Sequence, residues 1–243
     1  MRKIIFLIVF VLCVQHNTVQ AQAFEKGDVI LELGVGFGIY GTQQKSTTNL
    51  SFTVAGIIPL SNLETHDTTD GAASLMIPIS FEYAISNKFG IGADLTINKY
   101  FIDEKDRDKL KSVGGTDFGI KLNYHILNSN KNDLFVGLGL GLSSINWKYK
   151  LNPSEEVYIE SASGSGSYFS LGIADRFYFS EKIGMLFYVN YKAYNYSDLD
   201  VDISQEALNY YEQQFNVTNV NFTQELDWIL KGVNIGFGVT YKF

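Results

Sequence analysis

Six charged side chains stand at positions that alternate with apolar residues along the chain. The acids are Glu32, Glu82 and Asp94, and the bases are Lys121, Arg176 and Lys192. Alternate residues of a β-strand share one face, so all six are expected on the face opposite the apolar one. An enclosed charge without a partner costs several kcal/mol, so acids and bases on an enclosed face must pair. The sequence therefore predicts a lumen charge network that plugs an interior, with a gated path for ions or solutes as the alternative.

Outside the N-terminal segment, His66 and His125 are the candidates for acid–base or nucleophilic chemistry. An acyl-transfer site needs a histidine beside a nucleophile and a third group that orients the ring. His66 is followed by Asp67, and His125 has Ser129 nearby, but neither stands in a recognisable catalytic motif. We expect His125 to belong to an interior hydrogen-bond network, and we assign no catalytic residue.

Three aspartates alternate in 198–202, as at the start of a calcium-binding loop. That loop needs glycine at its sixth position and glutamate at its twelfth, where this chain has Ile203 and Asn209. Period-two spacing instead predicts a strand with the carboxylates on one solvated face, followed by a short helix over 206–215. A weak divalent-cation site is the alternative for these aspartates, and we assign no metal site and no cofactor.

The elements that must position these residues show a regular alternation of apolar and other side chains. Eight segments carry it, at 29–39, 75–85, 89–97, 118–126, 134–142, 169–179, 183–191 and 229–243. Each is about as long as the 9–11 residues with which a tilted strand crosses a bilayer. Eight such strands are enough to close a small barrel whose interior is filled by side chains.

The lengths of the connections also alternate. Short connections are expected at 86–88, 128–132 and 180–182, and long ones at 41–74, 103–115, 151–167 and 197–227. Tight periplasmic turns and long external loops are typical of outer-membrane barrels with both termini in the periplasm. The sequence therefore predicts an all-β fold, an eight-stranded antiparallel up-and-down transmembrane β-barrel in the cell outer membrane.

A water-soluble barrel or sandwich is the alternative to a membrane barrel. The chain has 22 glycines but only 3 prolines, and many glycines lie on the face opposite the apolar one, as in 34–38 and 137–141. A solvated outer face would carry larger polar residues, whereas a narrow lumen needs small residues where its walls approach. The glycine pattern therefore favours the membrane barrel.

The N-terminus has the layout of a secretory signal peptide. Arg2 and Lys3 precede an apolar stretch over 4–14, and small residues suit cleavage after Ala21 or, nearly as well, after Ala23. We take 1–21 as the signal peptide and 22–243 as the outer-membrane β-barrel domain. The single cysteine would leave with the signal, so no disulfide is expected.

Two residues interrupt the strand patterns. Pro78 lies inside the second segment although it cannot donate a ladder hydrogen bond, and a bulge or a place at the outer rim would accommodate it. Asp175 falls on the apolar register of the sixth segment, where a carboxylate would face lipid. We expect a bulge there or a position close to the periplasmic rim.

The last strand resembles the C-terminal assembly signal of bacterial outer-membrane barrels. Its outward-facing residues would be Phe237, Val239, Tyr241 and Phe243. The stretches 77–83 and 88–92 resemble an outer-membrane β-barrel domain family that is common in Bacteroidetes and includes PorT-like small barrels. The resemblance implies outer-membrane lipid and the barrel assembly machinery as partners, with other envelope proteins as further candidates.

Three functions remain open on this basis. The first is a non-enzymatic barrel with an envelope, surface-interaction or assembly role. The second is a narrow, porin-like channel for small or apolar solutes, and the third is an enzyme that modifies outer-membrane lipid. The net charge of −7 argues against non-specific binding of nucleic acid, which needs a basic surface.

Overall fold

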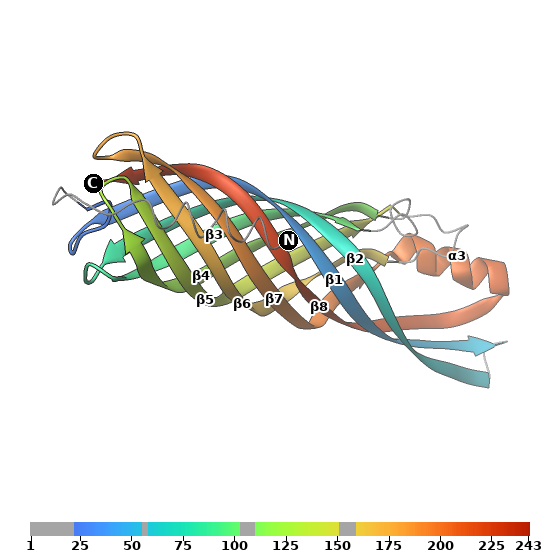
Figure 1. Cartoon of the computed structure of the whole chain (residues 1–243). Helices are drawn as coiled ribbons and strands as arrows, with labels where there is room; N and C mark the ends of the chain where they lie inside the picture. The colour runs from blue at the N-terminus through green and yellow to red at the C-terminus, as the bar shows by residue number, and fades with distance from the viewer. Residues whose placement is uncertain (1–21, 55–57, 103–109, 151–158) are drawn as a thin grey trace, which may run out of the picture.

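The strands of the protein form one closed barrel (Figure 1). The computed structural model describes residues 22–54, 58–102, 110–150 and 159–243. Within these ranges each of eight strands pairs antiparallel with its neighbour in sequence, and β8 pairs back onto β1. The elements are β1 Val29–Val54, β2 Ile58–Ala84, β3 Phe89–Ile102, β4 Leu110–Asn128, β5 Asn132–Tyr149, β6 Ile159–Tyr178, β7 Ile183–Ile203, α3 Gln205–Phe215 and β8 Val217–Lys242. The predicted eight-stranded antiparallel barrel is confirmed, whereas the predicted signal peptide lies outside the described residues.

The apolar register of the strands faces outward around the whole barrel. On β1 it comprises the alternate exposed residues from Leu31 to Ile39, and every other strand contributes a similar set. At the usual strand rise and tilt, this stretch spans about 20 Å along a membrane normal. A closed sheet with an apolar outer belt satisfies its backbone hydrogen bonds inside a bilayer. The protein is therefore an integral barrel of the cell outer membrane, as predicted.

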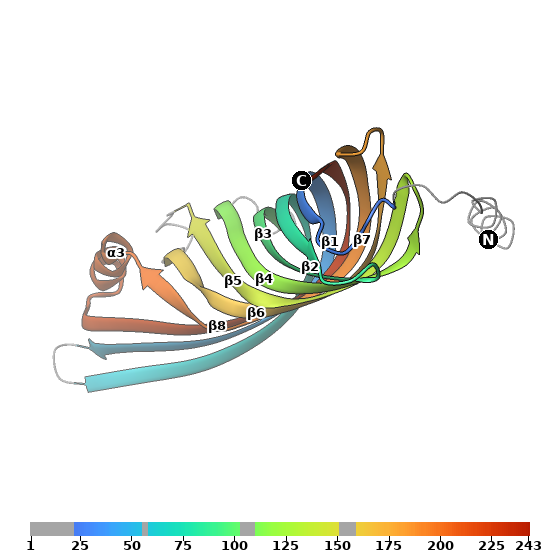
Figure 2. The ribbon, with the colours of Figure 1, turned by 90° about the vertical axis from the view of Figure 1, so that its left-hand side faces the viewer.

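The two ends of the barrel differ in length and shape (Figures 1 and 2). The turn end holds the C-terminus and the short connections 85–88, 129–131 and 179–182. The extended end holds the outer parts of β1, β2 and β8, together with α3. Outward-facing ring pairs, such as Phe89–Tyr124 and Tyr241–Phe243, mark the turn-end border of the belt, where aromatic girdles of membrane barrels lie. No helix in the described ranges is both long and apolar enough to cross a membrane.

The strands run much further than the apolar pattern predicts. The connection expected over 41–74 is largely a β-hairpin, because β1 and β2 stay paired from Thr42↔Asp70 to Val54↔Ile58. β7 likewise continues to Ile203, so the predicted strand with alternating aspartates is present. The prediction of a long loop over 41–74 was wrong because the apolar pattern of the belt does not continue there. Every residue of 58–71 is exposed, and the side chains that β1 buries beyond Gly41 are those of Thr42 and Ser46, which are polar. The predicted helix over 206–215 is α3.

The polarity of the barrel reverses along its axis. Beyond the belt, the interior is an aromatic core, which we define as Tyr40, Tyr100, Val113, Ile145, Trp147, Ala162, Tyr168, Tyr194, Tyr196, Leu199, Leu226, Trp228 and Leu230. The outer surface at the same level carries exposed polar side chains, including Lys45, Thr116, Ser144, Asn195 and Lys231. The extended end is therefore built like a water-soluble barrel, and the belt region has the opposite arrangement.

Pro78 and Asp175, the two residues that interrupt the apolar pattern, lie in different surroundings. The β1–β2 register is the same on both sides of Pro78, at Leu33↔Ile79 and Gly36↔Met76, so these paired residues contain no bulge. Pro78 lies in the middle of the barrel, facing the lumen beside Gly34, and the expectation of a bulge or rim position was wrong. The missing side chain of Gly34 leaves room for the proline ring. Asp175 lies in continuous register three residues before the turn-end limit of β6, the rim position expected as one alternative.

Candidate functional site in the barrel lumen

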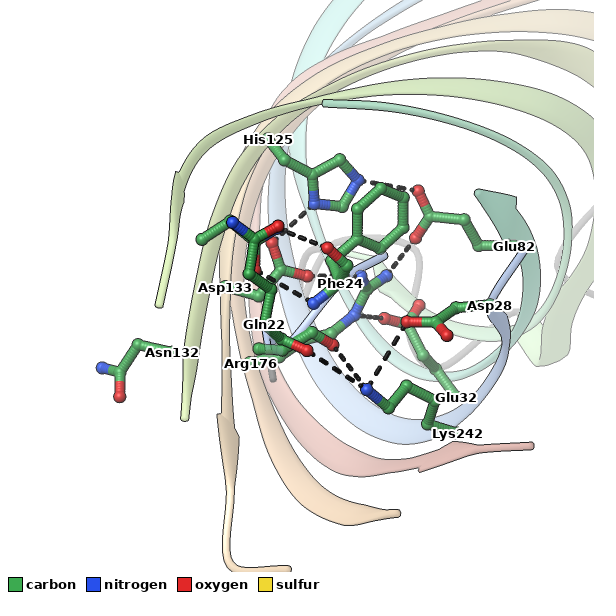
Figure 3. Close-up of polar contacts among 12 residues, drawn as sticks. Gln22, Phe24, Asp28, Glu32, Glu82, His125, Asn132, Asp133, Arg176 and Lys242 are labelled. Carbon is green, nitrogen blue, oxygen red and sulfur yellow. Dashed lines mark hydrogen bonds and ion pairs between the residues drawn. The ribbon is translucent and has the colours of Figure 1, made fainter. Parts of the chain in front are cut away.

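Arg176 is the centre of a polar cluster in the lumen near the turn end (Figure 3). Its fully buried guanidinium donates from Nε to Glu32 over 2.7 Å, from Nη1 to Asp133 over 2.8 Å, and from Nη2 to Glu82. These three carboxylates come from β1, β5 and β2, so one side chain from β6 links walls on different sides of the barrel. The fork geometry of arginine suits such multiple carboxylate contacts.

Lys121 adds a second cation to this cluster. Its Nζ atom lies 3.1 Å from Glu32 and donates to Ser80 over 2.9 Å, while Ser80 itself donates to Glu32. Glu82 has room to reach inward because Gly90 stands beside it on β3, where a Cβ atom would collide with the Glu82 carboxylate. The glycine-rich lumen face thus makes space for the larger charged side chains.

His125 completes the charge balance of the cluster. Its Nδ1 atom lies 2.5 Å from Asp133 and its Nε2 atom 3.1 Å from Glu82. A neutral imidazole can donate from only one nitrogen, so contacts with two carboxylates call for the doubly protonated ring. We define the charge cluster as Glu32, Glu82, Asp133, Lys121, His125 and Arg176. Three carboxylates then face three cations, which offsets much of the cost of burying each of them.

The segment before β1 closes the turn end over this cluster. Phe24 is fully buried and stacks on His125, with ring centroids 3.4 Å apart. The backbone N–H of Phe24 donates to Asn128 Oδ1 over 3.0 Å, and that of Ala23 donates to the carbonyl of Ser129 over 2.8 Å. Figure 3 shows this segment lying across the charge cluster. Residues 22–28 therefore act as a cap on the mouth of the lumen.

The two other residues of the predicted network, Asp94 and Lys192, lie further toward the extended end. Asp94 accepts a hydrogen bond of 2.7 Å from Tyr168. Lys192 lies 3.0 Å from Asp117, which also accepts from Tyr194 over 2.8 Å. The structure thus brings together Glu32, Glu82, Lys121 and Arg176, and it does not bring Asp94 or Lys192 to them. The expected pairing of three named acids with three named bases is wrong for these two.

Sequence reasoning missed Asp117 and Asp133 as interior acids, although a signal existed for both. Each precedes a predicted strand segment by one residue, since those segments begin at Phe118 and Leu134. Extending the same alternation by one position places both aspartates on the lumen face. Both are buried in the structure, Asp117 and Asp133 being 0% exposed.

A cavity of about 120 Å³ lies in the lumen between the charge cluster and the side chains of Asp94 and Lys192. Its walls include Lys121, Asp94 and Lys192, together with Asn123 and Tyr188. The Nδ2 atom of Asn123 and the hydroxyl of Tyr188 are buried without a hydrogen-bond partner among the described residues. Buried polar atoms in native proteins are nearly always satisfied, so this volume suits several ordered waters.

The aromatic core fills the lumen on the other side of the cavity. Trp147 and Trp228 meet edge to face at 4.7 Å, and Tyr194 and Tyr196 stack at 6.1 Å. Tyr40, a member of this core, donates a hydrogen bond to Asn234 Oδ1 over 2.6 Å. The lumen is therefore filled at two levels, by the charge cluster near the turn end and by the aromatic core near the extended end.

The two histidines lie far apart on the fold. His66 is on the exposed outer part of β2, and its Nε2 atom lies 3.4 Å from Glu64. His125 is at the turn end, where both ring nitrogens face carboxylates and neither faces a serine hydroxyl. In the described residues, neither ring therefore shows the arrangement of an acyl-transfer site.

The four residues of the proposed assembly signal are all exposed, three of them on the outer face of β8 (at the red end of the ribbon in Figure 1) and the fourth directly after it. They are Phe237, Val239, Tyr241 and Phe243. The backbone N–H of Phe243 donates to the carbonyl of Val29 over 2.9 Å, so the last residue takes part in closing the barrel. Recognition of this strand by an assembly machinery stays a prediction.

No protein-family model matches the chain, and no curated protein sequence matches it. Solved structures do match. The outer membrane protein OprG of Pseudomonas aeruginosa aligns with a TM-score of 0.54 and 16% identity, over 90% of this chain and 97% of that one. Neisserial surface protein A aligns with a TM-score of 0.42 and 11% identity, over 84% and 97%. The similarity to OprG shows the fold alone, and nothing in these matches bears on the resemblance to PorT-like barrels.

Proposed function

We propose that the protein is a non-enzymatic barrel with a closed lumen that anchors an interaction platform at the cell surface. The observation that carries this proposal is the filling of the lumen at two levels, together with strands that continue far beyond the belt. A barrel of eight strands has an interior just wide enough for side chains, and here large side chains occupy it. The resemblance to PorT-like small barrels is part of the proposal and rests on the sequence stretches alone.

The extended end has the construction of a platform. β1 continues for 13 residues after Gly41, reaching Val54 while paired with β2 on one side and β8 on the other. At the usual strand rise, this extension is about 40 Å long. α3 packs against β8 at the same end (Figure 2). A simple membrane anchor needs none of this, so the extension supports a role outside the bilayer.

A narrow channel is the second candidate, and the water-sized cavity in the lumen is the observation that favours it. Lys121, Lys192 and Asp94 would offer polar groups to a passing solute. Conduction would require both the cap of residues 22–28 and the aromatic core to move aside. The charge cluster would also have to break ion pairs that are buried from solvent. A closed barrel needs none of these movements.

Recording from planar lipid bilayers tests the closed lumen. We expect the unaltered protein to show no conductance, because large side chains fill the lumen at the charge cluster and again at the aromatic core. A matched pair of variants shows that the assay can detect opening. Trp147→Ala with Trp228→Ala and Arg176→Ala, combined with deletion of 22–26, opens the aromatic core, the charge cluster and the cap together and should give conductance, whereas Lys45→Ala at the outer surface should remain silent. A large and steady conductance from the unaltered protein would overturn the proposal and favour the channel.

A further inference from the structure

The outer part of β2 has a free edge. Residues 58–71 pair with β1 on one side, whereas pairing with β3 begins only at Ala72↔Ile102. Within the described residues no strand pairs with the other side of this segment. Every residue from Ile58 to Gly71 is exposed. Figures 1 and 2 show this part of β2 at the margin of the extended end.

The free edge is long and regular. The β1–β2 register runs without a shift from Thr42↔Asp70 to Val54↔Ile58, so these paired residues contain no bulge. An edge strand presents unpaired N–H and C=O groups that can accept another strand, and proteins usually protect such edges with lysine, proline or a bulge. This edge has a proline only at Pro59, near its far end, and it has no lysine.

The edge is also acidic. It carries Glu64, Asp67 and Asp70 and no Lys or Arg between positions 58 and 71. Hydrogen bonds from Asn62 and His66 hold the pKa of the Glu64 carboxyl below its usual range. Alternation places Asp67 on one face of the strand and the other two acids on the opposite face. A docked strand would thus meet negative charge on both of its faces.

The nearest cation in the sheet does not neutralise this charge. Lys45 on β1 stands directly across from Asp67 on β2, but it also stands across from Asp227 on β8. One lysine is thus shared between two carboxylates. A second copy of this chain would bring another acidic edge with no Lys or Arg of its own, so repulsion disfavours self-pairing. An extended segment that carries lysines or arginines fits both the free backbone groups and the charge.

We propose that the edge of β2 over residues 60–71 binds a basic, extended polypeptide segment by addition of a β-strand. Backbone hydrogen bonds would supply the affinity, and the acids on the two faces would select basic side chains. The proposal rests on the proposed function, since it names the class of partner that the extended end would hold. It does not depend on whether the lumen conducts.

Peptide binding to the purified full chain in detergent micelles tests the proposal. The probe is a fluorescent peptide of about twelve residues that alternates lysine with threonine and valine, which matches the length of the edge. Fluorescence anisotropy should show saturable binding, and hydrogen exchange should slow at the amides of 60–71. The variant Asp67→Lys with Asp70→Lys should bind about tenfold more weakly. The matched control, Glu160→Lys with Glu181→Lys, changes the net charge equally at exposed sites elsewhere and should bind normally.

Two further peptides separate strand addition from simple charge attraction. A peptide with glutamate in place of lysine should not bind. A peptide methylated on alternate backbone nitrogens keeps its charge but loses the donors on one edge, so it should also lose binding. Equal binding of the methylated peptide, or no slowing of exchange at 60–71, would overturn the proposal. So would a concentration-dependent dimer that is cross-linked through Thr65→Cys, because it would show that a second copy occupies the edge.

The outcomes keep this proposal separate from the proposed function. If the peptide binds and the unaltered barrel conducts, the closed lumen falls and the docking edge stands. If the barrel is silent and no peptide binds, the docking edge falls and the closed lumen stands.

Discussion

Phe24 stacks face to face on His125, with ring centroids 3.4 Å apart and an interplanar angle of 12°. The contact joins the segment before β1 to the charge cluster, 101 residues away along the chain. It also excludes water from the side of the imidazole that faces the turn end. Through this pair, the position of the cap (residues 22–28) and the burial of charged His125 in the charge cluster depend on each other.

Replacing Phe24 with alanine should release the cap without unfolding the barrel. The cap can detach on its own, so the cost should appear as local opening rather than as global unfolding. We expect trypsin to cleave after Lys26 about tenfold faster in Phe24→Ala than in the unaltered protein. Phe24→Leu, which keeps most of the apolar volume, should lie between them. Equal cleavage rates for all three proteins would show that the stacked ring does not hold the cap.

Replacing Arg176 with methionine should destabilise the barrel strongly. The change leaves Glu32, Glu82 and Asp133 buried with fewer cations, and breaking a buried ion pair typically costs about 3–5 kcal/mol. Urea unfolding in lipid vesicles measures the free energy of unfolding. Adding Glu82→Gln to Arg176→Met should recover part of the loss, because it removes one stranded charge. A double variant less stable than the single one would contradict this account.

Adding a side chain to a lumen glycine should prevent the barrel from closing. A Cβ atom at Gly236 would collide with the ring of Tyr188 and the carbonyl of Val35. Gly236→Val should therefore fail to gain heat-modifiable mobility in electrophoresis, the usual sign of a folded membrane barrel. Gly41→Val is the matched control, since a Cβ atom there meets only one backbone oxygen at 4.0 Å. Normal folding of both variants would show that the lumen is less tightly packed than the structure indicates.

Deleting Phe243 should reduce assembly in cells more than stability. Its side chain is 66% exposed on the outer face, so it adds little to the packing of the finished barrel. We expect less protein in the outer membrane, with near-normal refolding from urea into detergent. Phe215→Ala serves as the control for loss of an exposed aromatic side chain elsewhere. Normal cellular levels of the deletion variant would refute a role in assembly.

Labelling of cysteines on intact cells tests the orientation of the barrel. Thr69→Cys on β2 and Asn209→Cys on α3 should react with an impermeant reagent, because the extended end is expected outside the cell. Glu181→Cys, in a turn at the other end, should react only after the outer membrane is broken. The reverse pattern would place the turn end outside.

The fold could be predicted from the sequence because the bilayer imposes a strict pattern. Along each belt segment the apolar side chains face lipid at every second position, so strand number and order follow from periodicity alone. The outer parts of β1 and β2 could not be predicted in this way. Residues 61–70 of β2 meet water on both faces, and the residues that the outer part of β1 buries, Thr42 and Ser46, are polar, so the apolar alternation of the belt does not continue into either.

The lumen could be predicted only in part. Alternation assigns Glu32 and Arg176 to the interior, but it says nothing about the stagger between β1 and β6 on which their contact depends. The stagger between β3 and β6 likewise decides that Asp94 meets Tyr168 rather than an arginine. The cap was missed because Phe24 belongs to no periodic segment, and only its place directly before β1 hints at the mouth of the barrel.

The reversal of polarity along the axis divides the thermodynamics of the barrel into two parts. In the belt, the apolar side chains of the folded barrel face hydrocarbon. Packing them against one another therefore removes little apolar surface from water, and the hydrophobic effect contributes little to that packing. At the extended end, Trp147, Trp228 and their neighbours leave water only when the core forms. Exposing such apolar surface to water raises the heat capacity. Local opening of the extended end, with the belt still in the bilayer, should therefore carry a positive heat-capacity change and become easier in the cold.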